Sequence, residues 1–573
     1  MHARPHAARP ARLAPLALLA LLAAPPAAAG DRVEGQPFAT RSVVLARHGM
    51  VAAAHPLAVQ AGLEILRKGG TAADAAIAVN AALAVVEPVA CGLGGDLFAL
   101  AWDPKRKHLD GLNASGRAPL AARRELVPAT PEGTIPPYTP WAWTVPGAAS
   151  GWFALHARYG RLPMSAVLAP AIALAEQGAP VPQHIAAAWK RSEKVFGQKP
   201  GFAETFLPGG HAPAEGAVFR NPALARTFRL LAAGGEAAYY RGPIARALVE
   251  FSKANGGLFT MEDFARHRAD WVEPITTTYR GVTVHEIPPP GQGLTTLLLL
   301  DLLETFDLKG LGRDSPDFWH ALVEAKKVAF ADRARWLADP AFAPVPAEGL
   351  LSKDYARRRA ALVDMAKAAQ VVPPGDPGVG TDTTYLAVAD RDGMMISLIQ
   401  SNYTGFGSGY AVPSLGFGIH NRGAQFALAA DHPNRLEPGK RPFHTIIPAF
   451  LSRGGEPWCA FGVMGGATQP QGQAQIVVNL VDFGMNPQEA GDAPRFVHDG
   501  SQEPTGTAMA DGGKLALEKG VPAAVREELA RRGHRLVEMP GNYGGYQAVC
   551  RDPATGVLSG ASESRKDGHA AGY

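Results

Sequence analysis

Two hydroxyl-bearing residues, Thr383 and Ser401, have a spacing that could assemble a nucleophile for acyl transfer. Residues 385–389 form an alternating run, Arg391-Asp392-Gly393 is typical of a turn, and residues 396–399 form the return run. This pattern predicts a β-hairpin. If the connection is a three-residue loop, register counting places Ser401 opposite Thr383, so that the two hydroxyls face each other at the open end of the hairpin.

The tract before Thr383 favours self-cleavage of the backbone between Asp382 and Thr383, because residues 373–380 are rich in Gly and Pro. A threonine hydroxyl is a weak nucleophile and needs an adjacent base. The α-amine that cleavage would release titrates near neutrality, so one residue would supply both nucleophile and base. The alternative is an ordinary linker followed by a strand that begins with threonines.

The stretch 380–409 resembles the γ-glutamyltransferase family of N-terminal nucleophile hydrolases. The similarity continues in motifs spread over nearly the whole chain after the N-terminus: PPPGQG at 288–293, ADR at 331–333, LADP at 337–340, KRP at 440–442, GG at 465–466, NP at 486–487 and APRF at 493–496. The resemblance implies an α/β fold, a four-layer αββα sandwich built from two interleaved chains of one precursor.

The resemblance also implies which residues act on the substrate. Thr383, rather than Thr384, matches the family's nucleophile by its distance from the hairpin turn. Ser401 falls where the family has a second hydroxyl that hydrogen-bonds the nucleophile. Gly465 and Gly466 align with a Gly-Gly pair whose backbone N–H groups would stabilise the tetrahedral oxyanion. A strand-end serine in contact with water and a simple turn are the alternatives for these positions.

The predicted substrate-binding residues depart from those of the family's best-known members. The arginine that holds the γ-glutamyl α-carboxylate in an F-R-E-like segment is shifted here to Arg117. His444 and Thr445 replace a pair of serines after the R-P dipeptide. Gln425 replaces the aspartate that pairs with the substrate ammonium, and Tyr403 stands where asparagine or glutamate is usual.

These departures predict an acyl group with a distal carboxylate and no α-amine. A neutral amide such as that of Gln425 cannot give an ammonium the charge-assisted hydrogen bond of a carboxylate, whereas Arg117, Arg422 and His444 would offer donors to an anion. The full predicted substrate-binding set is Arg117, Asn402, Tyr403, Arg422, Gln425, His444 and Thr445. The connector 427–440 looks shorter than the family's lid, which favours hydrolysis over transfer to peptide acceptors.

The function predicted under the family name is that of a self-cleaving amidohydrolase, which hydrolyses or transfers γ-glutamyl-type acyl groups such as that of glutathione through a threonine acyl-enzyme. Because the departures resemble the branch with glutaryl-cephalosporin acylases and oxamate amidohydrolases, an acylase for an acyl group that carries a carboxylate and lacks the α-amine is the alternative. An inactive periplasmic binding protein on the same fold is a second alternative. The mechanism requires no cofactor, and His55, His320 and His432 lack a spacing that suggests a metal site.

The N-terminus predicts export. Residues 1–29 combine arginines at positions 4, 9 and 12 with an apolar run at 13–23 and an A-x-A site at 27–29, as secretory signals do. The run is too short to span a bilayer, although a retained anchor is the alternative. We expect a periplasmic or secreted heterodimer without a stable membrane anchor, made of a large subunit, 30–382, and a small catalytic subunit, 383–573.

Composition excludes nucleic acid as an expected partner. The chain has 573 residues, 47% hydrophobic and 19% charged, which is typical of globular protein. Loss of the signal removes three arginines and no acids, so the formal charge falls from +4 to about +1. No basic cluster or nucleic-acid motif appears.

Several elements that position these residues can be expected from periodicity and caps. The expected helices are 55–66, 72–86 with Thr71 and Asp74 as its capping pair, one that begins at Asn221-Pro222 and ends at Gly234-Gly235, a core helix at 294–303, and 316–337, 471–480 and 522–532. The expected strands are 443–451, 458–463, 547–550 and 557–560.

The glycine-rich run 91–98 predicts a tight turn where two backbones approach. The charges on helix 316–337, Lys326, Lys327, Arg333 and Arg335, are read as a solvated face.

Three scattered cysteines, Cys91, Cys459 and Cys550, have neither CxxC nor histidine spacing. We interpret them as mostly buried small hydrophobic residues, with one bridge possible and no role in catalysis or metal binding.

Overall fold

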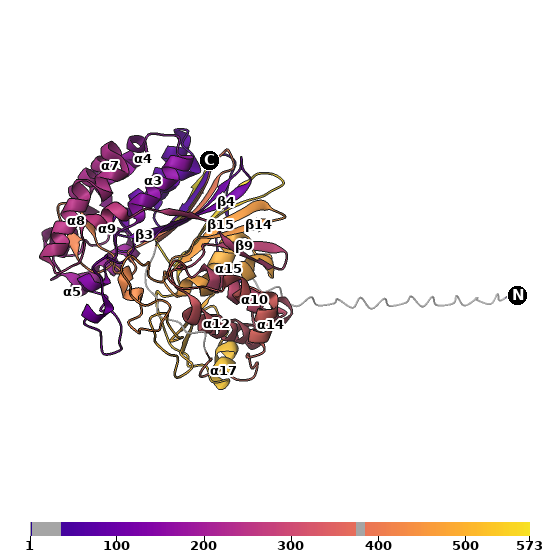
Figure 1. Ribbon diagram of the computed structural model, residues 1–573. Coiled ribbons are helices and arrows are strands. Elements are labelled where there is room, and N and C mark those ends of the chain that lie inside the picture. The colour runs from indigo at the N-terminus through magenta and orange to yellow at the C-terminus, as the bar shows by residue number, and fades with distance from the viewer. Residues whose placement is uncertain (1, 3–35, 374–383) are drawn as a thin grey trace. The chain divides into compact units, whose positions relative to one another are not determined.

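Two seven-stranded sheets lie face to face in the unit Thr40–Tyr573, to which everything below refers (Figure 1). The structure, a computed structural model, describes residues 2, 36–373 and 384–573. Apart from residue 2, the predicted signal sequence lies outside these described residues, as do Asp382 and Thr383, so the predicted cleavage sites stay predictions.

The first sheet holds the predicted hairpin at its centre. Its strand order is β20 (His569–Gly572), β2 (Met50–Ala53), β10 (Thr384–Ala389), β11 (Met395–Ser401), β3 (Asp96–Asp103), β4 (His108–Ala114) and β7 (Asp270–Val272). The order in the second sheet is β1 (Val44–Ala46), β19 (Leu558–Ser562), β18 (Gly545–Arg551), β15 (Glu456–Met464), β14 (Ala449–Arg453), β9 (Val282–Glu286) and β8 (Ile275–Tyr279). The sheets meet where β2, β10 and β11 pack on β15, β18 and β19.

Helices cover the outer face of each sheet, on opposite sides of the strands in Figure 1. The layer on the side of the first sheet comprises α1 (Pro56–Arg67), α2 (Ala72–Val86), α3 (Ala148–Tyr159), α4 (Met164–Gln177), α7 (Pro222–Tyr240) and α8 (Pro243–Ala254). The layer on the side of the second comprises α10 (Gly293–Leu303), α12 (Pro316–Trp336), α14 (Lys353–Ala360), α15 (Thr468–Val481) and α16 (Pro487–Asp492). The predicted four-layer αββα sandwich is therefore confirmed.

Short elements join and flank these layers. They include α5 (Gln183–Phe196), α6 (Phe202–Phe206), α9 (Met261–Arg266), α11 (Leu308–Leu311), α13 (Ala347–Leu350), α17 (Ala523–Arg531), β5 (Ala179–Pro180), β6 (Val218–Phe219), β12 (Ala411–Val412), β13 (Phe417–Gly418), β16 (Phe496–Asp499) and β17 (Lys514–Leu517).

The hairpin has the predicted register. Thr384 pairs with Gln400, and the Asp390 N–H donates to Met394 O at 3.1 Å, which leaves a three-residue loop at 391–393. Gly393 has a φ of 88°, which only glycine adopts without strain. Every residue of β10 and β11 is buried between β2 and β3, so the open end of the hairpin is held in place by both neighbours.

The capping pair expected for α2 is present, and α1 has an N-cap that its sequence pattern did not predict. The His55 side chain accepts a hydrogen bond from Leu57 N at the start of α1, and Thr71 with Asp74 forms a capping box on α2. All residues of α2 are buried. Since most of them are alanine, the helix can lie close to β10 and β11, which it contacts.

Other boundaries differ from the expected ones. Gly235 interrupts α7 with a φ of 61°, yet the helix resumes and continues to Tyr240. The strand expected at 443–451 begins only at Ala449. The core helix α10 is buried along its whole length as expected, and no helix in the described ranges is long and apolar enough to cross a membrane.

The solvated face expected on α12 is wrong for three of its four basic residues. Lys326, Lys327 and Arg333 are at most 2% exposed, and only Arg335 faces solvent. Each of the two buried lysines has an acceptor within reach: Lys327 Nζ lies 2.8 Å from Glu324 Oε1, and Lys326 Nζ donates to Ser501 Oγ at 2.6 Å. Glu324 lies on α12 itself, one turn before Lys327, whereas Ser501 comes from a distant segment, which helical periodicity does not report.

The cysteines are buried as expected, and the structure shows which two form the one disulfide that the sequence left possible. Cys459 and Cys550 face each other across the β15–β18 pair and form a disulfide, while Cys91 is buried and free.

Candidate active site

The end of β11 is anchored to the glycine-rich turn that follows α2. Ser401 is fully buried, and its Oγ accepts a hydrogen bond from the Tyr403 backbone at 2.8 Å. The Asn402 N–H donates to Ala90 O at 3.0 Å. The burial of Ser401 excludes the alternative of a strand-end serine in contact with water, although its role beside Thr383 stays a prediction.

The first described residue of β10 is fixed in the same place. Thr384 Oγ1 donates to Glu87 Oε2 at 2.5 Å, and both residues are buried. The expected close approach of backbones occurs nearby, since a Cβ on Gly94 would lie 1.9 Å from Gly418 O. The position next to Thr383 is therefore held by side-chain and backbone contacts.

Predicted substrate-binding residues meet around Arg422, the first residue of a 3-10 turn, Arg422–Gln425. Arg422 Nη1 donates to Thr445 Oγ1 at 2.8 Å, and the guanidinium lies 4.6 Å from the centre of the Tyr403 ring. The Tyr403 hydroxyl accepts a hydrogen bond from Gln425 Nε2. Tyr403 reaches this position with a left-handed backbone, φ 76°.

Asp96, the first residue of β3, is a site residue that the sequence analysis missed. Its Oδ2 lies 3.0 Å from His420 Nδ1, 3.5 Å from Arg422 Nε and 3.6 Å from His444 Nε2, and all four side chains are fully buried. Its Oδ1 accepts a hydrogen bond from Gly116 N at 2.7 Å. A lone acid at the start of an apolar strand must be paired when buried, and this signal could have identified it.

These contacts determine the charges at the site. Burial disfavours the ionised form of Asp96, but His420 and Arg422 outweigh it and hold its pKa well below the usual value. Burial lowers the pKa of His444 well below 6.5, so this ring is neutral at pH 7. Asp96 therefore balances the charge of Arg422, which the sequence analysis had counted only as a donor for an anion.

Several buried polar atoms of this cluster have no hydrogen-bond partner among the described residues. They are Arg422 Nη2, both ring nitrogens of His444, Asn402 Oδ1 and Gln425 Oε1. Buried polar atoms are normally hydrogen-bonded. Their convergence indicates a position where a polar ligand binds.

The predicted oxyanion turn lies between β15 and α15. Gly465 and Gly466 have φ angles of 124° and 59°, which disfavour any residue with a side chain. Their carbonyls accept hydrogen bonds from Thr468 N at 3.0 Å and Gln469 N at 3.1 Å. This arrangement turns the carbonyls toward the helix, and the predicted role of the two N–H groups stays a prediction.

Gln292, in the PPPGQG motif, ties this turn to the substrate-binding residues. Its Nε2 donates to Gly466 O at 2.9 Å and to Thr445 O at 2.6 Å, and its Oε1 accepts from Arg333 at 2.5 Å. Arg333 also lies 3.9 Å from Glu503, whose pKa burial raises to about 8 against the opposing effect of Arg333. Gln292 is not among the predicted site residues, and the solvated face predicted for Arg333 is wrong.

Arg117 lies apart from this group. Its guanidinium is 3.1 Å from Asp270 and 4.0 Å from Asp339, and Arg441 shares Asp270 at 2.7 Å. The contacts described for the Arg117 side chain do not include the residues around Arg422, so its part in substrate binding stays a prediction.

The connector 427–440 packs onto the site through Asn434. The Asn434 Nδ2 donates to Gln425 O at 2.6 Å and to Pro504 O at 2.9 Å, and its Oδ1 accepts from Phe443 N at 2.9 Å. These bonds fix the backbone of Gln425.

The two stacked sheets, with helices on both outer faces, have the fold of the N-terminal nucleophile hydrolases. The family model of gamma-glutamyltranspeptidase matches residues 58–573. The glutathione hydrolase-like YwrD proenzyme of Bacillus subtilis is 38% identical over 535 residues, which cover 92% of this chain and 99% of the relative. The acylase ACY 1 proenzyme of Pseudomonas sp. (strain SE83) is 36% identical over 543 residues, which cover 91% of this chain and 92% of that one.

A comparison with solved structures indicates the same family. The crystal structure of a cephalosporin acylase from Bacillus halodurans superimposes with a TM-score of 0.86 at 43% identity, and the match covers 95% of this chain and 99% of that one. The chain belongs to the gamma-glutamyltranspeptidase family, and it is an enzyme of that family. The predicted family and fold are confirmed.

Proposed function

We propose that the protein hydrolyses amides whose acyl group ends in a carboxylate and carries no α-amine, through an ester on Thr383. The observation that carries this proposal is the fully buried Arg422, whose Nη2 lacks a hydrogen-bond partner among the described residues. A carboxylate is the acceptor that pairs best with a guanidinium. Gln425 lies beside it with a neutral amide in the position where an ammonium would require a carboxylate.

In the proposed reaction, backbone cleavage after Asp382 frees the α-amine of Thr383 and separates subunits 30–382 and 383–573. Thr383 Oγ attacks the amide carbonyl while its amine takes the hydroxyl proton and passes it to the leaving amine. Backbone N–H groups of Gly465 and Gly466 stabilise the oxyanion, and Ser401 orients the threonine hydroxyl. Water then hydrolyses the ester and regenerates the threonine. A cleaved signal and export to the periplasm or medium belong to the same proposal.

Hydrolysis or transfer of γ-glutamyl groups, such as that of glutathione, is the second candidate. The family itself and the name of the Bacillus subtilis relative favour it. The acylase names of two other similar proteins favour the first. Asp96 does not decide between them, because three basic side chains already surround its carboxylate.

Comparing kcat/KM for glutaryl-anilide and γ-glutamyl-anilide tests the substrate. We expect the glutaryl compound to be preferred. Gln425→Glu, which keeps the shape of the side chain and adds a charge, should shift the ratio toward γ-glutamyl by about 10- to 100-fold, the worth of one hydrogen bond to a charged group. A clear preference of the unchanged enzyme for γ-glutamyl-anilide would overturn the acylase assignment.

Two threonine variants test the nucleophile separately. Thr383→Ala should remain one chain by intact mass and turn over neither anilide. Thr384→Ser, which retains the hydroxyl that bonds Glu87, should still be cleaved and active. Unchanged turnover in Thr383→Ala would remove Thr383 from its proposed role.

A further inference from the structure

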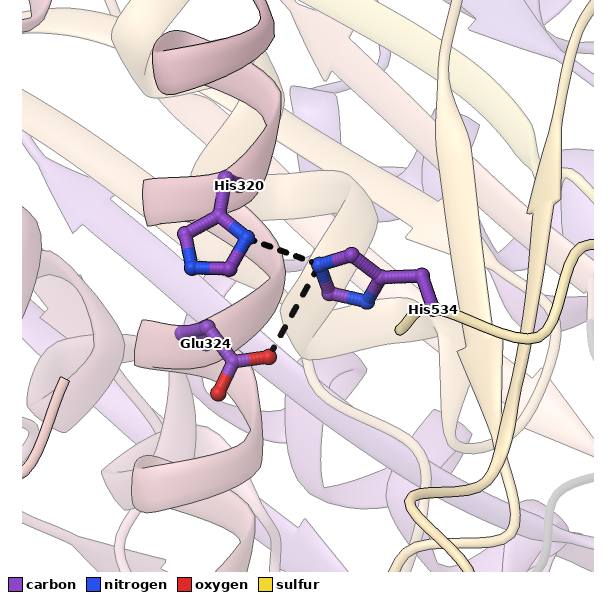
Figure 2. A group of neighbouring side chains, drawn as sticks. All are labelled: His320, Glu324 and His534. Carbon is purple, nitrogen blue, oxygen red and sulfur yellow. Dashed lines mark hydrogen bonds and ion pairs between the residues drawn. The ribbon is translucent and has the colours of Figure 1, made fainter. Parts of the chain in front are cut away.

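Three buried side chains converge outside the active site, His320 and Glu324 of α12 and His534, which follows α17 (Figure 2). Each offers one ligand-type atom, and these atoms all lie within 4.8 Å of one another. Figure 2 shows His320 and Glu324 on one face of the helix, with His534 facing both. The i,i+4 spacing of His320 and Glu324 places both side chains on one face of a helix, a relation that the spacing of histidines alone does not indicate.

The hydrogen bonds around the cluster aim its acceptor atoms inward. His320 Nε2 donates to the carbonyl of Asp364 at 2.8 Å, so the lone pair of His320 is on Nδ1, which lies 2.8 Å from His534 Nε2. Histidines that bind metals commonly donate their other ring N–H to a backbone carbonyl in this way. Glu324 Oε2 accepts from Ala369 N at 3.0 Å, while Oε1 lies 3.9 Å from His534 Nε2.

Without a cation, two ordinary contacts satisfy the same atoms. His534 Nε2–H can donate to His320 Nδ1, and Lys327 Nζ lies 2.8 Å from Glu324 Oε1. Neither contact prevents metal binding. The neutral ring of His534 can carry its proton on Nδ1 instead, and Lys327 has a second acceptor in Ala369 O at 2.9 Å. A cation would therefore take the place of the proton on His534 Nε2, which moves to Nδ1, and of the Lys327 ammonium beside Glu324. No proton would be released from the protein.

We propose that His320, Glu324 and His534 form a binding site for Zn²⁺ or a similar late first-row divalent cation. Two imidazoles and one carboxylate suit such a cation, whereas Mg²⁺ and Ca²⁺ require oxygen ligands. Tetrahedral zinc places its ligand atoms about 3.3 Å apart, so the two histidines must separate slightly while Glu324 approaches His534. The fourth ligand would be water.

This site would be structural. Its ligands are at most 6% exposed, and none of them belongs to the cluster around Arg422. His320 and Glu324 precede the predicted cleavage site and His534 follows it, so the cation would join α12 to the segment after α17 across the two proposed subunits.

The test uses the mature protein after removal of metals with EDTA. Titration with Zn²⁺ by calorimetry should show one equivalent bound, Co²⁺ should give visible absorption bands of a four-coordinate site, and Zn²⁺ should raise the Tm. His534→Gln and Glu324→Gln should each weaken binding by more than about 100-fold, beyond the usual loss of an outer-shell partner. His211→Gln is the matched control, because exposed His211 lies 3.1 Å from Glu193.

A fourth variant distinguishes a metal site from a pair of hydrogen-bonded histidines. Lys327→Met removes the ammonium that competes for Glu324 and should bind Zn²⁺ more tightly than the unchanged protein. Amide turnover should be equal in all of these variants, which verifies their folding. The proposal is overturned if the unchanged protein and Lys327→Met take up no stoichiometric Zn²⁺ or Co²⁺, or if uptake is the same in His534→Gln and Glu324→Gln.

Discussion

At the scale of single residues, Asp96 and Gln292 connect the predicted site residues, which the sequence motifs indicated only as separate positions. Arg422 and His444 were predictable because each occupies a position next to a recognisable motif. Asp96 and Gln292 were not, since their roles depend on burial and on partners from distant segments: Asp96 on His420 and Arg422, Gln292 on the backbone of 445 and 466.

Gln292→Met tests whether this glutamine positions the oxyanion turn. The variant keeps the volume but loses the donors to Gly466 O and Thr445 O. We expect kcat to fall by about 10- to 100-fold with little change in KM. The reason is that removing an oxyanion-hole donor itself costs about 10²–10³-fold and Gln292 acts only through the turn.

Gln475→Met is the matched control for Gln292→Met. Gln475 is another buried glutamine with two backbone acceptors, Gln471 O and Phe496 O. Its variant should lose stability and retain kcat. Equal losses of kcat in both variants would show that Gln292 only stabilises the fold and does not position the oxyanion turn.

At the scale of elements, local signals determined where helices and strands lie, and tertiary surroundings determined what their faces contact. The capping box of α2 and the hairpin turn are local, and both were predicted. The environment of α12 is not local. Its lysines looked solvated because charges on helices usually are, yet α10 and the segments 369 and 498–503 surround it.

Lys326→Met tests the buried state of α12. Burial lowers the pKa of Lys326 well below 10.5, and Arg333 lowers it further. At any pH between that lowered pKa and 10.5, Lys326 is protonated in the unfolded chain and deprotonated in the folded protein. The stability that Lys326 contributes therefore rises with pH across this window. The Tm of the unchanged protein should increase more from pH 6 to pH 9 than that of the variant.

At pH 9 the variant should be less stable by about 1–3 kcal/mol, because Ser501 and His498 lose their buried partner. Arg335→Met, on the exposed part of the same helix, should change stability by less than about 0.5 kcal/mol at either pH. Parallel pH profiles for Lys326→Met and the unchanged protein would show that Lys326 does not titrate in this window.

At the scale of the whole molecule, both sheets combine strands from the two sides of the predicted cleavage site. In the first sheet β10 and β11 lie between β2 and β3, and in the second β1 pairs with β19 while β9 pairs with β14. Cleavage would leave two chains that share every layer of the core. Separation would expose the buried faces of both sheets, so the subunits should remain together without a covalent link.

The disulfide allows this form of association to be tested. Cys459 and Cys550 both follow residue 383, and Cys91 is buried and free, so no disulfide crosses the proposed cleavage site. The mature protein should elute as one species in gel filtration and yet separate into two chains on a denaturing gel run without reductant. Adding reductant should not change the number of bands. A single band that splits only with reductant would place Cys91 in a bridge between subunits, whereas one uncut chain that still hydrolyses amides would contradict the proposed processing itself.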